Sequence, residues 1–219
     1  MTKTKAIIFD MDGTLVDSIP FHKEAWLLFL KKHDINLDPD QFQAQNHGNL
    51  GEMIRRFFGH DISDEKAGEL GQEKEIIYRD LYKKHIKEID GLTDLLNTMK
   101  KRNIKASLAT MGDTPNIDFI LDELKIRHFF HSITGGHQIV RGKPDAEIFK
   151  LALKKLNFKS TECIVIEDSL GGVYSAIKAG LKVIGITTSH SADELKQNGC
   201  FYTISDFKEL DLDSVLQSS

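Results

Sequence analysis

The chain has 219 residues, of which 40% are hydrophobic and 28% are charged, a composition typical of a soluble globular protein. The net charge of −4 argues against a general nucleic-acid-binding protein, because there is no basic excess to neutralise a phosphate backbone. The apolar runs are too short for a signal peptide or a membrane span, so we expect no membrane association.

The first predicted element is a buried strand, Lys5 to Asp10, and two acidic residues stand at its end, Asp10 and Asp12. In an extended chain residues i and i+2 point to the same side, so both carboxylates are expected in one pocket. Two like charges that close are unfavourable unless a cation neutralises them or one carboxylate is protonated. The pair therefore indicates a role in chemical reaction rather than in stabilising the fold. Taken alone, however, Asp12-Gly13 could form a turn, and Thr14 or Asp17 could cap a helix.

The next region, from about Ser18 to Glu88, contains no convincing strand and is predicted to be helical. The expected helices include Phe21 to His33, Leu50 to Phe58 and Glu65 to Ile86. We interpret residues 17–88 as a helical domain inserted between two parts of a core domain, residues 1–16 and 89–219.

The remainder of the chain alternates between short apolar strands and helical patterns, which predicts an α/β fold with a doubly wound parallel sheet. The further strands are expected at Ile104 to Thr110, Ser132 to Thr134, Cys163 to Asp168, Lys182 to Thr187 and Phe201 to Ile204. Most of these runs are continuously apolar, as expected of strands that are covered on both faces. The helices between them are expected at Leu92 to Arg102, Pro115 to Leu124, Ala146 to Leu156 and Gly172 to Ala179.

Polar residues follow several of these strands, at the edge where open α/β sheets bind ligands. Thr110 ends the second strand, Lys143 lies in a Gly-Lys-Pro sequence before a helix, and Glu167-Asp168 ends the fourth strand. Taken singly, Thr110 is an ordinary strand end, Lys143 a solvated lysine, and the acidic pair a helix N-terminal cap. Because acids on a buried strand end are costly without a cation, we favour a metal site there.

Only two cysteines occur, Cys163 and Cys200, and their spacing fits neither a metal site nor a redox motif. Cys163 opens an apolar strand and is interpreted as a core residue. This cysteine content favours a reducing, cytoplasmic location.

These motifs resemble those of the haloacid dehalogenase (HAD) superfamily, and the resemblance covers nearly the whole chain. The sequence from Asp10 to Thr14 is similar to the first family motif, Thr110 to the second, Lys143 to the third and Glu167-Asp168 to the fourth. The helical insert resembles the cap domain of the first subclass. The resemblance thus implies a Rossmann-like HAD core with an inserted helical cap.

The resemblance also implies phosphoryl transfer, and the residue types suit that chemistry. Asp10 is the expected nucleophile, forming an aspartyl-phosphate, and Asp12 the expected general acid and base. A Mg²⁺ ion is expected on Asp10, the Asp12 carbonyl, Asp168 and, with less support from the sequence, Glu167. Lys143 is expected to contact both the phosphate and the Asp10 carboxylate. The Thr110 hydroxyl is expected to contact the phosphate, with backbone amides near Met11 to Gly13 and at Met111.

The insert is expected to select the substrate, because caps of this subclass close over the core and exclude water. His22 and Trp26 lie on one helical face and match a His-x-x-Ala-Trp arrangement of β-phosphoglucomutase and sugar phosphatases. Trp26 can equally be cap core, and His22 a surface residue. His47, Asn49 and Asp113 are further candidates for binding sugar hydroxyls, the first two in a segment that resembles the substrate-specificity loop.

Two departures from the phosphomutase pattern favour a phosphatase. Gly51 stands where the mutase has a cap arginine, and Gly112-Asp113-Thr114 replaces its Ser-Lys-Asn group. An acid in place of a cation repels a distal phosphate. Arg55 and Arg56 follow one helical turn later and could substitute for the missing cation.

The leading hypothesis is a Mg²⁺-dependent phosphohydrolase of a small phosphorylated metabolite, namely a sugar or polyol phosphate. The alternatives are a β-phosphoglucomutase-type phosphomutase and a phosphorylatable binding or signalling module without turnover. Dehalogenase activity is disfavoured, since dehalogenases of this superfamily lack the second aspartate. The expected partner is a small molecule rather than nucleic acid or membrane, and the oligomeric state stays open, a monomer being compatible with the sequence.

Overall fold

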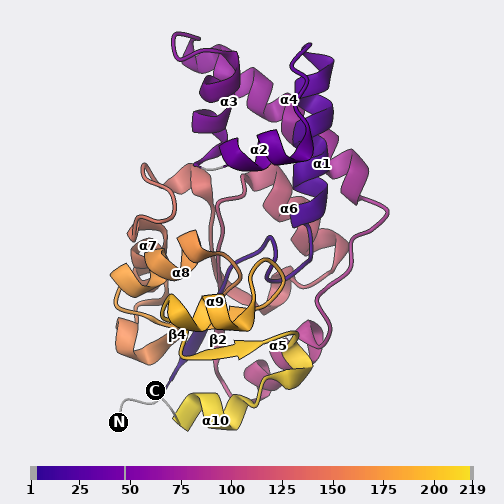
Figure 1. Ribbon diagram of the computed structural model, residues 1–219. Coiled ribbons are helices and arrows are strands. Elements are labelled where there is room, and N and C mark those ends of the chain that lie inside the picture. Colours follow the sequence, from indigo (N-terminus) through magenta and orange to yellow (C-terminus); the bar gives the residue numbers. More distant parts are fainter. Residues whose placement is uncertain (1–3, 47, 218–219) are drawn as a thin grey trace. The chain divides into compact units, whose positions relative to one another are not determined.

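The computed structural model describes residues 4–46 and 48–217, and the described residues include a six-stranded parallel sheet, of which β2 and β4 are labelled in Figure 1. The strand order is β3-β2-β1-β4-β5-β6, so the chain first winds to one side of β1 and then to the other. This is the doubly wound arrangement that the sequence predicts. The strands are β1 (Ala6–Phe9), β2 (Lys105–Ala109), β3 (Phe130–Thr134), β4 (Cys163–Glu167), β5 (Lys182–Ile186) and β6 (Tyr202–Ile204).

Helices cover this sheet because its strands carry apolar side chains on both faces. On one face Ile8, Val165 and Val183 share a core cluster with residues of α7 (Glu147–Leu156), α8 (Leu170–Lys178) and α9 (Ala192–Gln197). On the other face the Phe9 ring contacts the rings of Phe130 and Phe207, with centroids 6.2 and 6.1 Å away. The remaining helices of this part of the chain are α5 (Leu92–Lys101), α6 (Thr114–Glu123) and α10 (Leu212–Gln217).

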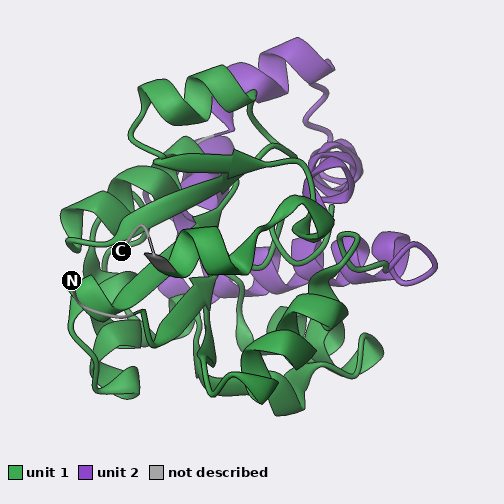
Figure 2. Ribbon diagram, turned by 90° about the horizontal axis from the view of Figure 1, so that it is seen from below, with its two compact units in different colours: residues 1–17, 87–219 green, residues 18–86 purple. Residues whose placement is uncertain are grey.

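The chain divides into two compact units (Figure 2). The core unit comprises residues 1–17 and 87–219, and the helical unit comprises residues 18–86. Their limits lie within two residues of the predicted domain boundaries. The second unit consists of α1 (Ile19–Lys32), α2 (Pro39–Gln45), α3 (Leu50–Phe58) and α4 (Asp64–Tyr82). Its core is aromatic, since Trp26 lies within 5.8–6.3 Å, ring to ring, of Phe29, Phe42 and Phe57.

The differences from the predicted elements are at ends and in short helices. β3 begins two residues earlier than predicted, and α4 ends at Tyr82 instead of Ile86. The short helices α2, α9 and α10 are additional to the predicted ones. Across residues 4–46 and 48–217, no helix combines the length and apolar character needed to cross a membrane.

Candidate functional site

The candidate site lies at the carboxyl end of β1, the strand at which the strand order reverses. β1 pairs with β2 on one side and with β4 on the other, so Phe9 is level with both Leu108 and Ile166. The residues that follow these strands, Asp10, Thr110 and Glu167-Asp168, therefore meet at one edge. All of them are buried, with between 0 and 6% of their surface exposed.

An ion pair network joins Asp10 to residues far away in the sequence. The Lys143 ammonium donates to Asp10 Oδ1 and to Glu167 Oε1, each at 2.6 Å. The other Glu167 oxygen, Oε2, accepts hydrogen bonds from the Ser169 amide at 2.8 Å and the Ser169 hydroxyl at 3.0 Å. Lys143 follows Gly142 and precedes Pro144, to which it is joined by a cis peptide bond. The network fixes one cation beside the predicted nucleophile.

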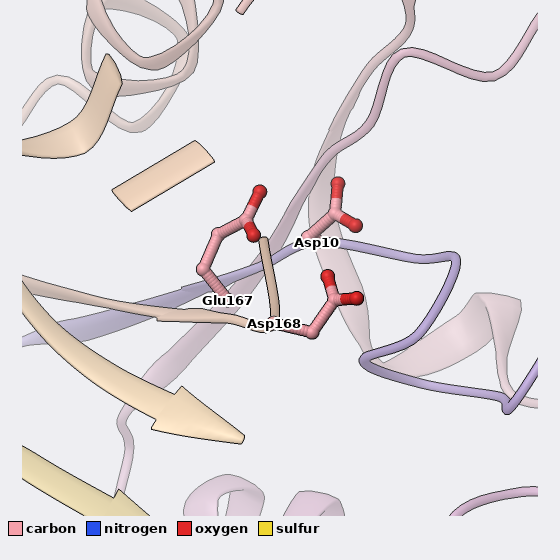
Figure 3. Close-up of side chains that lie close together, drawn as sticks. All are labelled: Asp10, Glu167 and Asp168. Carbon is pink, nitrogen blue, oxygen red and sulfur yellow. The ribbon is translucent and has the colours of Figure 1, made fainter. Parts of the chain in front are cut away.

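Three carboxylates gather at this point, those of Asp10, Glu167 and Asp168 (Figure 3). One oxygen of each lies within 4.8 Å of the others. Asp168 also accepts a hydrogen bond from the Ser189 hydroxyl. Ser189 is not among the residues predicted from the sequence, although it follows β5, the neighbour of β4, so the strand-end pattern that indicates Asp10 and Asp168 also applies to it.

Burial and mutual repulsion make this cluster electrostatically unfavourable. Burial raises the pKa of Asp10 to about 7, with repulsion from Glu167 and Asp12 adding to burial and Lys143 opposing it. Burial, with the charges of Glu167 and Asp10, raises the pKa of Asp168 well above its usual value. Although burial lowers the pKa of Lys143, the carboxylates of Asp10 and Glu167 outweigh that effect and raise it. The lysine therefore stays cationic, and one cation faces three acids.

This donor set fits a divalent cation. Carboxylate oxygens are hard ligands of the kind that Mg²⁺, Ca²⁺ and Mn²⁺ prefer, and a bound cation would remove the repulsion that raises the two aspartate pKa values. Asp10, Glu167 and Asp168 could supply the ligands. The predicted fourth ligand, the backbone carbonyl of Asp12, stays a prediction.

Two glycines allow the acidic side chains to pack this closely. Gly13 has a φ of +79°, and a Cβ there would lie 2.1 Å from Asp168 Oδ2. At Gly172, in the first turn of α8, a Cβ would lie 1.6 Å from Glu167 Oε1. Both positions therefore lack space for any side chain.

The other predicted residues of this unit lie near the same strand ends, but their proposed roles stay predictions. The Thr110 hydroxyl accepts a hydrogen bond from the Gly112 amide at 3.0 Å. Asp113 caps α6, its carboxylate accepting from the Asn116 amide at 3.0 Å, and Met111 is half-buried. The Gly13 amide donates to the Val16 carbonyl at 2.7 Å, so it closes the loop after β1.

The predicted substrate-binding residues of the helical unit have structural partners within it. The His22 ring stacks on Tyr78 at 3.6 Å, and its Nδ1 lies 2.8 Å from the Lys74 ammonium. Trp26 is 5% exposed, and Asn49 caps α3 by accepting from the Glu52 amide at 2.9 Å. His47 lies outside the described residues. Binding by these side chains stays a prediction.

Comparison with known proteins agrees with this arrangement. The family model described as haloacid dehalogenase-like hydrolase matches residues 7–186. The chain belongs to that family. A crystal structure of a family IA HAD hydrolase from Entamoeba histolytica has a TM-score of 0.90 with this chain, 32% identity and 98% coverage of both chains. The predicted HAD fold is thereby confirmed.

Two relatives of known activity illustrate the range of the family. Validoxylamine A 7'-phosphate phosphatase from Streptomyces hygroscopicus subsp. limoneus is 26% identical over 88% of this chain and 90% of its own length. Beta-phosphoglucomutase from Bacillus subtilis is 31% identical, with 83% of each chain covered. The proteins similar to this chain thus include both a phosphatase and a mutase.

Proposed function

We propose that this protein is a Mg²⁺-dependent phosphohydrolase that dephosphorylates a small phosphorylated metabolite through an aspartyl-phosphate. The observation that carries the proposal is the buried Asp10 carboxylate, paired with Lys143 at 2.6 Å and clustered with Asp168 and Glu167. A carboxylate so placed can attack phosphorus only if the repulsion between two anions is offset. The charged lysine supplies one part of that offset.

Each step of the proposed reaction uses residues of the core unit. An Asp10 oxygen attacks phosphorus, and the bond to the leaving alcohol breaks as Asp12 donates a proton to it. Asp12 then takes a proton from water, which attacks the acyl phosphate and releases inorganic phosphate with Asp10 restored. Lys143 and the Thr110 hydroxyl hold the phosphoryl oxygens. Mg²⁺, held by Asp10, Asp168, Glu167 and the Asp12 carbonyl, would supply further neutralisation of negative charge.

A sugar or polyol phosphate is the proposed substrate class. The phosphatase relative from Streptomyces acts, by its name, on a 7'-phosphate of validoxylamine A. We propose that His22, Trp26, His47 and Asn49 of the helical unit, with Asp113, recognise the leaving group.

A phosphomutase is the second candidate, because the beta-phosphoglucomutase of B. subtilis is 31% identical. A mutase needs a cation for a second phosphate, and both substitute arginines already have partners in the helical unit. Arg55 pairs with Asp64, and Arg56 donates to the Gln45 carbonyl at 2.8 Å. Asp113, an acid on the segment after β2, adds repulsion. These contacts favour hydrolysis of a monophosphate.

The test is phosphate release from sugar phosphates, nucleotides, phosphoglycolate and pyrophosphate, measured with and without Mg²⁺. Asp10→Asn is expected to abolish release, whereas Asp193→Asn, an exposed aspartate on α9, is expected to leave it unchanged. An active Asp10→Asn enzyme would contradict the nucleophile assignment. Isomerisation of a sugar 1-phosphate without phosphate release would select the mutase.

The Asp12→Asn variant distinguishes a phosphatase from a phosphorylatable signalling module. Without the general base the phosphoenzyme should form slowly and persist, and mass spectrometry would detect it as a phosphorylated chain. The native enzyme should not accumulate it. A native phosphoenzyme that persists for hours would instead support the phosphorylatable binding module.

A further inference from the structure

A cavity lies in the core unit, at the opposite ends of the strands from the candidate site. It has a volume of about 420 Å³ and is bounded by the C-terminal half of α5, the start of β2 and the start of β3. Lys105 opens β2, and Thr110 follows the end of the same strand. Five residues at about 3.3 Å each separate the two positions by roughly 17 Å. The cavity is therefore separate from the catalytic carboxylates.

Apolar and aromatic side chains form part of the wall of this cavity. Leu96 and Met99 of α5 are each 1% exposed, Ala106 of β2 is 4% exposed, and the rings of Phe129 and Phe130 are half-buried. The volume lies within the range of pockets that hold small organic molecules. A flat apolar ring would pack there against the rings of Phe129 and Phe130.

The rim of the cavity is cationic. Lys100, Lys105, His128 and His131 line it, together with Asn103, and none of the described lining residues is acidic. The chain as a whole has a net charge of −4, so this local excess does not follow from composition. The Lys100 ammonium lies 5.8 Å from the centre of the Phe129 ring, and the His128 ring lies 4.1 Å from the same ring. Hydrogen-bond donors of Lys100 and His128 therefore lie directly beside the Phe129 ring.

A helix C-terminus carries partial negative charge, which repels a nearby anion. At the C-terminus of α5 this effect is reduced, because the last carbonyls are hydrogen-bonded. The chain turns at Asn103, whose φ is 58°, and backbone amides cover the last carbonyls of the helix. The Ile104 amide donates to the Met99 carbonyl at 2.9 Å, and the Asn103 amide donates to the Lys100 carbonyl at 3.2 Å. The side chains of Lys100 and Lys105 therefore determine the charge of the rim.

We propose that this cavity binds a small organic anion that carries a flat apolar ring. The ring packs against the Phe129 and Phe130 side of the cavity, and the anionic group meets the Lys100 ammonium. The proposal does not depend on the reaction proposed above.

The probe for this site is naphthalene-2-sulfonate, which has a flat ring and a permanent charge but no phosphate ester to be hydrolysed. Its neutral counterpart is 2-naphthylmethanol. Titration of the full chain is followed by amide chemical shifts, and the largest shifts are expected at Lys100, Asn103, Phe129 and Phe130. The amides of Thr110 and Asp168 should not move.

Variants then test whether the Lys100 charge recognises the anion. The native protein should bind the sulfonate with about fivefold higher affinity than the alcohol, which corresponds to one charge-assisted contact at an exposed side chain. Lys100→Gln should abolish that preference, while its amide spectrum remains that of a folded protein. Lys101→Gln, the adjacent exposed lysine that does not line the cavity, should retain it.

The proposal would be overturned by the absence of saturable binding, by shifts that map to other parts of the chain, or by an unchanged preference in Lys100→Gln. A loss of preference in both Lys100→Gln and Lys101→Gln would overturn it too, because it would indicate a general attraction of anions to the end of the helix.

Discussion

Adjacent glycines at the start of α8 allow a matched test of how the Glu167–Lys143 pair is held. A Cβ on Gly172 would lie 1.6 Å from Glu167 Oε1 and 1.9 Å from Glu167 Cδ, whereas a Cβ on Gly171 would meet nothing within 4 Å. Gly172→Ala should therefore displace the Glu167 carboxylate, and Gly171→Ala should not.

The expected magnitude follows from what Glu167 would lose. Its carboxylate is fully buried and accepts hydrogen bonds from the Lys143 ammonium, the Ser169 amide and the Ser169 hydroxyl. Ordinary carbon–oxygen contact needs a shift of about 1.5–2 Å, which breaks the 2.6 Å pair with Lys143. Since a hydrogen bond to a charged group contributes about 1.5–3 kcal/mol, we expect a loss of about 3 kcal/mol or more for Gly172→Ala. Gly171→Ala should instead gain up to about 1 kcal/mol from helix propensity.

The assays are urea unfolding followed by circular dichroism and phosphate release by the folded variants. Gly172→Ala should also lower phosphate release by about a hundredfold, because Lys143 loses one of its two carboxylate partners. Equal stability and activity of the two variants would refute the reasoning, since it would mean that Glu167 moves without cost.

Three further predictions concern ionisation and packing. Asp10 has a pKa of about 7 and must lose its proton to bind a cation. Mg²⁺ affinity measured by calorimetry should therefore be about tenfold weaker at pH 6 than at pH 8. An affinity that does not change with pH would exclude Asp10 as a ligand. Burial raises the pKa of Cys163 and Cys200 to about 12. At pH 8 an aromatic disulfide reagent should therefore label both thiols on the order of a thousandfold more slowly in the native protein than in urea. Rapid labelling of the native protein would contradict the burial of these thiols. Trp26→Ala should destabilise the helical unit by about 3–5 kcal/mol in chemical denaturation, whereas a change below 1 kcal/mol would show that the ring is not core.

The strands and the candidate site were largely predictable because each depends on a local pattern. Continuous runs such as Ile7-Ile8-Phe9 and Ile164-Val165-Ile166 predict buried strands, and polar residues after a strand indicate the binding edge. The contact between Asp10 and Lys143 was only implied by the resemblance, since nothing local joins residues separated by 133 positions.

The misplaced and missed elements carry weaker or conflicting signals. β3 is an edge strand whose first residues, Phe130 and His131, are half-buried and exposed, so its pattern is not continuously apolar. After Tyr82 the polar run continues without a glycine or proline, and the predicted α4 therefore ran too far. The short helix α9 does have a signal, a capping box between Ser191 and Glu194, that could have been used.

The pairing of Lys143 with Asp10 and Glu167 has a consequence for the order of folding. The three side chains come from the start, the middle and the later part of the chain, and they meet only when β4 docks beside β1. Contacts this distant form late, after loop-closure entropy has been overcome. During refolding, helical signal from residues 18–86 should therefore recover before turnover does, and a nascent chain that ends before β4 would have no working centre.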